Sequence, residues 1–142
     1  MALIAGLALA EGVNSANTVG YTTANVAKDT YYMLGLQYEK VGGGAIPVQD
    51  LVKGTFVGVN FDENGAFLQT APKLQVWTPS GYNMYYYIND AYDAVKNDGT
   101  VYEGWADSFG NYVTDNFPIG YGFWFKPTTA ATASFTSPLS AN

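Results

Sequence analysis

Apolar and polar residues alternate along residues 119–126, Ile-Gly-Tyr-Gly-Phe-Trp-Phe-Lys, and this pattern predicts a central strand. Neighbouring side chains of a strand point to opposite faces of the sheet. One face is wholly apolar or aromatic and is expected to be buried; its members are Ile119, Tyr121, Phe123 and Phe125. The opposite face carries two glycines beside Trp124, which indicates that another backbone or a large ring lies close against it.

Short segments with the same two-residue period occur along most of the chain. We predict strands over residues 18–26, 30–37, 55–61, 73–78, 82–88, 100–106 and 131–136. The turn sequence Pro-Ser-Gly at 79–81 predicts a hairpin, and Asp-Glu-Asn-Gly at 62–65 predicts a second one that returns into 67–69. Residues 47–53 and 90–96 are each compatible with a short helical turn.

Strands of this length, separated by turn sequences, are typical of antiparallel architectures. The predicted fold is therefore all-β, an antiparallel β-sandwich or jelly-roll-like barrel with one or two short helical turns. A chain of 142 residues is long enough for one domain with a proper core, and no stretch resembles a linker. We assign residues 17–142 to that single domain.

Residues 1–16 differ from the rest of the chain, because they begin with an apolar run rich in Ala and Leu. The segment is either the remnant of a secretory signal, ending in small residues, or a retained apolar arm. Its ten apolar residues are too few for a membrane span, which needs about 20. A retained arm would need cover, and we expect it to mediate self-assembly through Leu3, Ile4, Leu7 and Leu9.

Charge and composition narrow the possible functions. Charged residues make up 13% of the chain, the net charge is −6, and all six basic residues are Lys. An acidic chain without Arg lacks the guanidinium groups that bind phosphates through two hydrogen bonds in nucleic-acid-binding proteins, so nucleic acid is not an expected partner. The chain has no His and no Cys, which removes Ser-His and Cys-His catalysis, imidazole or thiolate metal sites and disulfides. We therefore predict no catalytic residue, no cofactor and no metal.

Acidic residues offer two further candidate sites. The clusters at 62–64 and 90–98 could supply oxygens to Ca²⁺, but they lack the spacing of a calcium loop and coincide with predicted turns. Glu103, Asp107 or Asp115 could form the carboxylate pair of a glycoside hydrolase. Asp and Asn side chains more commonly accept hydrogen bonds from the backbone of turns and helix ends than bind metals or substrates.

Aromatic residues make up 16% of the chain and provide the main candidate contact surface. Rings on alternating strand faces could stack against sugar rings, or they could fill the core and subunit contacts. We favour the second use, because a domain of this size needs many of its aromatics inside. The candidate set is Trp77, Tyr85, Tyr87, Trp105 and Trp124.

Several short sequences resemble a group of largely uncharacterised secreted proteins of planctomycete–verrucomicrobial bacteria. These are Ala-Asn-Thr-Val-Gly-Tyr at 16–21 after the apolar leader, Leu-Gln-Val-Trp at 74–77, Gly-Trp-Ala-Asp at 104–107 and Gly-Tyr-Gly-Phe-Trp-Phe at 120–125. The resemblance covers islands between residues 16 and 137, and the section 42–70 departs from it. It implies export and a β-domain, and it assigns no site residue.

The expected function is that of an exported, non-catalytic structural subunit of a cell-surface or extracellular assembly, filament- or layer-like, whose partners are copies of itself. Few charges, many Tyr, an apolar arm and the lack of a catalytic set support this hypothesis. The alternative is a secreted carbohydrate-binding module that uses surface Trp and Tyr, with a polysaccharide as its partner.

Overall fold

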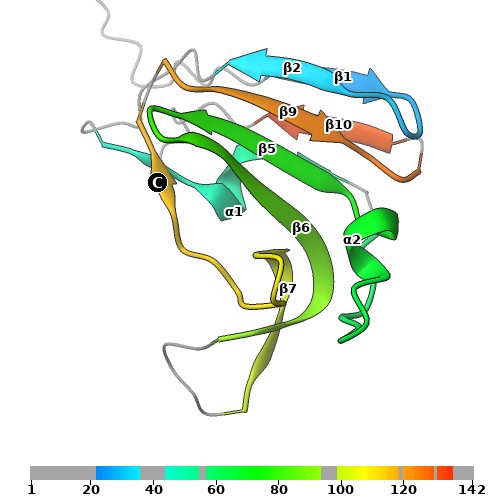
Figure 1. Cartoon of the computed structure of the whole chain (residues 1–142). Helices are drawn as coiled ribbons and strands as arrows, with labels where there is room; N and C mark the ends of the chain where they lie inside the picture. The colour runs from blue at the N-terminus through cyan, green and yellow to red at the C-terminus, as the bar shows by residue number, and fades with distance from the viewer. Residues whose placement is uncertain are drawn as a thin grey trace, which may run out of the picture.

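The computed structural model describes residues 22–35, 44–54, 57–93, 99–118, 120–129 and 131–135. Within these ranges the protein is mostly β, as predicted, with two short helical turns and no closed barrel. The largest sheet is antiparallel, and its five strands lie in the order β2-β9-β5-β6-β7 (Figure 1). Their bounds are β2 Tyr32–Gly35, β9 Gly122–Lys126, β5 Lys73–Thr78, β6 Gly81–Tyr92 and β7 Val101–Ala106.

Smaller elements form a second layer behind one face of this sheet (Figure 1). One is a three-stranded sheet, β1-β10-β4, and another is the two-stranded pair β3-β8; the helical turn α1 follows β3. Their bounds are β1 Thr22–Val26, β10 Ala131–Phe135, β4 Lys53–Gly54, β3 Ile46–Pro47, β8 Asn116–Phe117 and α1 Val48–Leu51.

The main core lies between these two layers. In β9, Phe123 is 2% exposed and Phe125 is fully buried, which confirms the predicted inner face at these two positions. Tyr121, just before β9, is half-buried against the same core. Their cross-strand partners on β5 are Val76 and Leu74, and both are also buried. Cross-strand apolar pairs of this kind stabilise a sheet. Trp105 of β7 joins the same cluster, with its ring centroid 6.3 Å from that of Phe125.

Gln49 of α1 secures the edge strand β7. Its side-chain amide donates to the carbonyls of Trp105 and Val113, both at 2.8 Å, and accepts from the N–H of Trp105 at 2.9 Å. A primary amide presents one donor and one acceptor side, as a peptide group does, so Gln49 pairs with Trp105 like a residue of a neighbouring strand. Gly104 makes room for this, since a Cβ there would lie 2.7 Å from Gln49 Oε1.

A second, smaller core lies on the opposite face of β6 and is covered by α2, Phe67–Thr70 (Figure 1). The ring of Phe67 lies 5.7 Å from that of Tyr86 and 5.2 Å from that of Phe61. The β6–β7 register shifts between Ile88 and Ala91. This end of the sheet is therefore buried on both faces, whereas the part formed by β2, β9 and β5 has its core on one face.

Three expected elements differ in the structure. Residues 67–69 do not form the second strand of a hairpin but belong to α2. The Asp62 carboxylate accepts hydrogen bonds from the next backbone N–H groups and stabilises the turn before α2. The N–H of Ala71 then donates to the carbonyl of Phe67 at 2.8 Å and closes a helical turn. The helical turn expected from residue 90 is wrong as far as Tyr92, since β6 continues to that residue by pairing with β7. Residues 94–98 lie outside the described ranges.

The third difference is the strand expected over 55–61. Residues 57–61 contain only a parallel bridge between Val59 and Ile88. It forms where β6 extends past Lys73, the first residue of β5, and no longer pairs with that strand. Residues 55–56 lie outside the described ranges, as do Ile119 and residues 1–21. The expected arm, with Leu3, Ile4, Leu7 and Leu9, therefore falls on residues whose structure is not described.

Candidate functional site

The outer face of the five-stranded sheet, pointing away from the main core, carries an unusual set of side chains. The strand registers place Met33 beside Trp124, Trp124 beside Gln75, and Gln75 beside Met84. These four residues form one row across β2, β9, β5 and β6, and we call it the middle row. Met33 at its end is 70% exposed, although a methionine is more often found inside.

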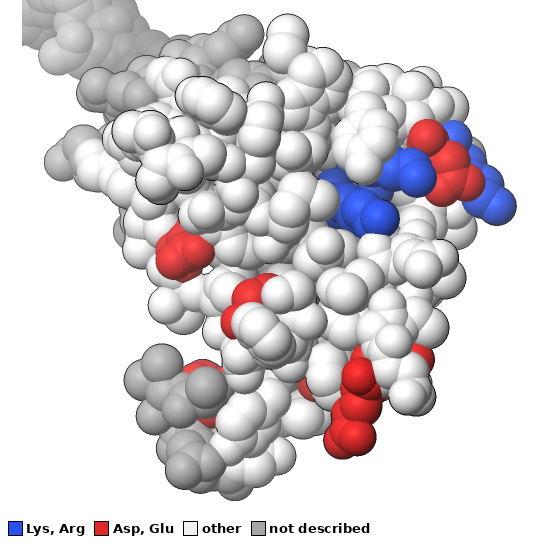
Figure 2. Space-filling view, in the orientation of Figure 1, with Lys and Arg blue, Asp and Glu red and all other residues white. Residues whose placement is uncertain are grey.

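Lysines lie at one end of the outer face, which Figure 2 views directly. Lys126 of β9 is the cross-strand partner of Lys73 of β5. The Lys126 ammonium lies 3.5 Å from Asp29 and 5.7 Å from the ring centroid of Tyr31. Lys73 lies 6.0 Å from the ring of Tyr86, and its pKa is lowered by burial and by the neighbouring charge of Lys126. This end of the face is cationic and partly screened by aromatic rings.

Aromatic rings and a shallow pocket lie at the other end of the outer face. Trp77 of β5 is 54% exposed and packs edge-to-face on Tyr82 of β6, with the ring centroids 4.6 Å apart. Next to Trp77 is a pocket of about 180 Å³. Its lining is formed by Trp77, Pro79, Gly120, Tyr121 and Gly122.

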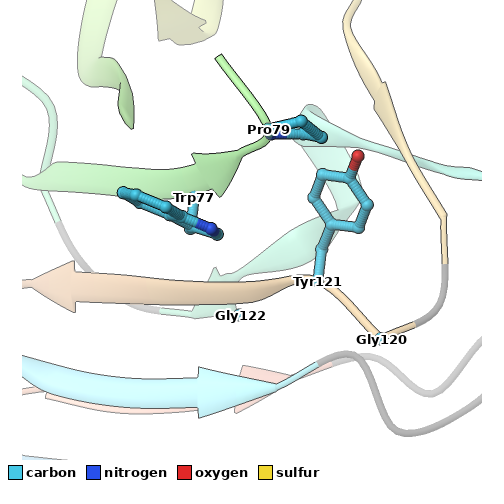
Figure 3. A pocket seen from close by; sticks show the side chains of 5 residues that line it. All are labelled: Trp77, Pro79, Gly120, Tyr121 and Gly122. Carbon is cyan, nitrogen blue, oxygen red and sulfur yellow. The ribbon is translucent and has the colours of Figure 1, made fainter. Parts of the chain in front are cut away.

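Figure 3 shows how the pocket is built. The indole ring of Trp77 lies along β5 with its nitrogen directed towards Tyr121, and the Tyr121 hydroxyl points towards Pro79. Gly120 adopts a φ of +89°, which glycine tolerates, and nothing lies within 4 Å of the position of a Cβ there. The pocket therefore has two aromatic walls, two polar donors and a glycine side without bulk.

The five aromatic residues expected to form a contact surface do not lie on one face. Trp77 is exposed and Trp124 is half-buried, both on the outer face. Tyr85 and Trp105 are buried in the main core, and Tyr87 packs edge-to-face on Trp105 at 5.3 Å. The structure thus divides the set between the core, which takes Tyr85, Trp105 and Tyr87, and the outer face, which takes Trp77 and Trp124.

Sequence reasoning did not select four other residues of the outer face: Met33, Tyr82, Lys73 and Lys126. The alternation of 73–78 already placed Lys73 and Trp77 on a common face. The contribution of β2 and β9 required the long-range register, which local patterns do not provide.

The candidate carboxylates all have hydrogen-bond partners within the domain. Asp115 accepts from the Tyr85 hydroxyl at 2.6 Å, and Glu103 accepts from the Tyr87 hydroxyl at 3.2 Å. Asp107 accepts from the N–H groups of Phe109 and Asn111 and so holds the turn after β7. Burial and the hydrogen bond to Asp115 raise the pKa of Tyr85, and burial and the charge of Glu103 raise that of Tyr87 to about 12.

The candidate calcium cluster at 62–64 is also a turn. The Asp62 carboxylate accepts from the N–H groups of Asn64 and Ala66, and the hydrogen bond from Asn64 lowers its pKa. In the described part of the chain, no three acidic side chains gather in a way that could hold a metal ion. No helix among the described residues has the length and apolar character needed to cross a membrane.

Comparisons with protein-family models, with curated proteins and with solved structures find no match for this chain.

Proposed function

We propose that the protein is an exported, non-catalytic structural subunit that associates with copies of itself into a filament- or layer-like assembly outside the cell. The observation that carries this proposal is the edge of the five-stranded sheet at β2. There, an edge strand lies beside the exposed apolar part of the outer face.

Strand β2 is the terminal strand of its sheet and pairs with β9 on one side, and no other strand of the described residues pairs with it. Edge strands present N–H and C=O groups to any chain that approaches, and proteins usually protect them with Lys, Pro or a bulge. The β2 sequence Tyr-Met-Leu-Gly contains neither Lys nor Pro. Met33 and, just before the strand, Tyr31 are instead exposed apolar side chains.

A segment from a neighbouring copy would cover this edge. Adding one strand to β2 would satisfy its outward groups and place alternate side chains beside Met33. The sequence offers a donor in the apolar arm of residues 1–10, with Leu3, Ile4, Leu7 and Leu9.

Two sequence features support the extracellular location. The apolar run of residues 1–10 is followed by small residues, as in the apolar region and cleavage site of a secretory signal, and the short islands of resemblance are to exported bacterial proteins. The low content of charged residues also suits a protein whose surfaces contact one another closely. Export and self-association are therefore proposed together.

The test is electron microscopy and analytical ultracentrifugation of the full chain and of matched variants. Met33→Lys places a charge on the β2 edge, and Val101→Lys makes the same change at another exposed apolar position, 54% exposed, in the opposite edge strand β7. We expect polymers for the wild type and Val101→Lys, and monomers for Met33→Lys and for a variant lacking residues 1–16.

Circular dichroism should show that each of these variants is folded. A wild-type protein that stays monomeric at high concentration would refute the proposed function. Polymers that persist in Met33→Lys would refute the role of the β2 edge, and polymers without residues 1–16 would refute the role of the arm.

A further inference from the structure

We propose that the pocket between Trp77 and Tyr121 binds a neutral sugar ring, as one unit of an uncharged polysaccharide. This is a second activity beside self-association, and Trp77 lies at the end of β5 away from Lys73. The ring surfaces, the polar groups and the charge of the pocket each suit such a ligand.

Trp77 presents a firmly held ring to solvent. Its ring is 54% exposed, yet Tyr82, itself 49% exposed, packs edge-to-face against it at 4.6 Å. Aromatic pairs in this geometry gain energy beyond simple burial, which limits the freedom of the Trp77 side chain. A rigid aromatic anchor binds a ligand at low conformational cost. The C–H groups of a sugar ring carry a partial positive charge and suit the negative face of an indole ring.

Polar groups at the pocket match hydroxyls. The indole nitrogen of Trp77 faces Tyr121, and the Tyr121 hydroxyl lies at the rim near Pro79 (Figure 3). The indole N–H is a donor only, whereas the phenol can donate and accept. A sugar has apolar C–H faces and hydroxyl edges, so it can use both the rings and these groups. A purely apolar peptide side chain would use only the rings and leave the polar groups without a function.

The charge of the pocket favours a neutral ligand. None of the five lining residues is charged, and the cationic end of the face, with Lys73 and Lys126, lies at the opposite end of β5 and β9. The chain as a whole carries a net charge of −6, which disfavours approach of an anionic polysaccharide. The shallow pocket of about 180 Å³ leaves the ligand open on its outer side, as a site for one unit of a longer chain requires.

The experiment measures binding of the full-length protein to immobilised polysaccharides by biolayer interferometry. The neutral probes are galactomannan, xyloglucan, xylan and a mixed-linkage glucan, and alginate is the anionic comparison. Trp77→Ala removes the main wall of the pocket, and Tyr121→Phe removes one hydroxyl while keeping the ring. Tyr31→Ala is the matched control, because Tyr31 is a 46% exposed aromatic at the lysine end of the same face.

We expect the wild type to bind at least one neutral polysaccharide, and Trp77→Ala to weaken that binding at least tenfold. Tyr121→Phe should weaken it several-fold, and Tyr31→Ala less than twofold. The matching free monosaccharide at millimolar concentration should compete. Trp77→Ala loses the ring contact with Tyr82 but empties no core position, so it should remain folded and unfold at a slightly lower temperature than the wild type, and lost binding will report on the pocket.

Four results would overturn this proposal. The first three are no binding to any neutral probe, binding to alginate alone, and equal effects of Trp77→Ala and Tyr31→Ala. Competition by a proline-rich peptide but by no monosaccharide would also overturn it, and would assign the pocket to peptides. The outcome is separate from the test of self-association, because Met33→Lys should still bind the polysaccharide and Trp77→Ala should still assemble.

Discussion

Replacing Gln49 tests how the edge of the sheet is held together. In Gln49→Leu the side chain keeps a similar size but loses both contacts to Trp105 and the one to Val113. The carbonyl of Trp105 retains the N–H of Val113 at 3.2 Å as a donor. The Trp105 N–H and the Val113 carbonyl are therefore the two groups for which the loss of the hydrogen bond to Gln49 costs most.

The expected loss follows from these two groups. A buried polar group that loses its hydrogen bond costs about 1–3 kcal/mol. Trp105 is fully buried, whereas Val113 is half-buried. Water can therefore donate a hydrogen bond to the Val113 carbonyl and reduce the cost there. We expect the free energy of unfolding to fall by about 2–4 kcal/mol. That is a large share of the roughly 5–15 kcal/mol typical of a domain.

Urea unfolding monitored by circular dichroism measures this change. With an m-value of about 2 kcal/mol/M, the midpoint should fall by about 1–2 M. The matched control is Gln69→Leu, since Gln69 is an exposed residue of α2, and its midpoint should stay within about 0.3 M of the wild type. Equal midpoints for the two variants would refute the role assigned to Gln49.

The substitution Gln49→Glu separates the donor from the acceptor. It keeps an oxygen for the Trp105 N–H but turns a carboxylate towards the two carbonyls that Gln49 Nε2 now serves. Only the protonated acid can donate to one of them, so folding should raise the pKa of this carboxyl. Its contribution to stability is then present at low pH and is lost as the pH rises through the folded-state pKa. Relative to the wild type, Gln49→Glu should therefore be less destabilised at pH 4 than at pH 7.

Three further predictions concern the core, the pH and metals. Phe123→Ala should lower the free energy of unfolding by about 3–5 kcal/mol in urea titrations, because it empties a fully packed site, whereas the exposed Phe109→Ala should change it by less than about 0.5 kcal/mol. Burial raises the pKa of Tyr85, and it raises that of Tyr87 to about 12, so the stability that depends on the neutral phenols is complete below pH about 10 and the Tyr87 share is lost as the pH rises through about 12. Thermal unfolding should therefore change little from pH 5 to 8 and shift to lower temperature above pH 10. Calcium should not raise the melting temperature, because Asp62 already accepts hydrogen bonds from its own turn, and a rise reversed by a chelator would contradict this.

Local pattern was sufficient for the strands whose alternation and turns agree. The hairpin of β5 and β6 was predicted from the apolar period of 73–78 and the turn at 79–81, and the inner face of β9 from Phe123 and Phe125. In these segments the buried side chains all occupy alternate positions of the strand, so the sequence alone identifies the buried face without knowledge of distant contacts.

Elements governed by distant partners were not predictable in this way. Asp90 and Tyr92 have turn and helix character locally, but pairing with β7 keeps them in β6. Gln49 was placed correctly on a helical turn, yet its bonding to Trp105 joins residues 56 apart in sequence. A polar residue whose partners are backbone groups across the core leaves no sign in the local sequence.

The outer face illustrates the same limit for function. Trp77 and Trp105 each lie near the end of a strand, and composition gives no reason to treat them differently. The pairing of Trp77 with Tyr82 places it on the open face, whereas the position of β7 against α1 buries Trp105 fully. An aromatic strand with rings of both parities, such as 85–87, cannot indicate which ring reaches solvent.

Alternation in β5 and β9 gives a direct means of separating fold from binding. Val76 and Phe123 are cross-strand partners in the core, while their sequence neighbours Trp77 and Trp124 lie on the outer face. Truncating Val76 or Phe123 lowers the free energy of unfolding, because it removes buried apolar surface and leaves a cavity. Changes at Trp77 act on a half-exposed ring and leave the packed layer behind it intact. Loss of binding with little loss of stability is therefore expected from the outward-facing Trp77 and not from Val76 or Phe123, and this parity links the proposed sugar site to the observed sheet register.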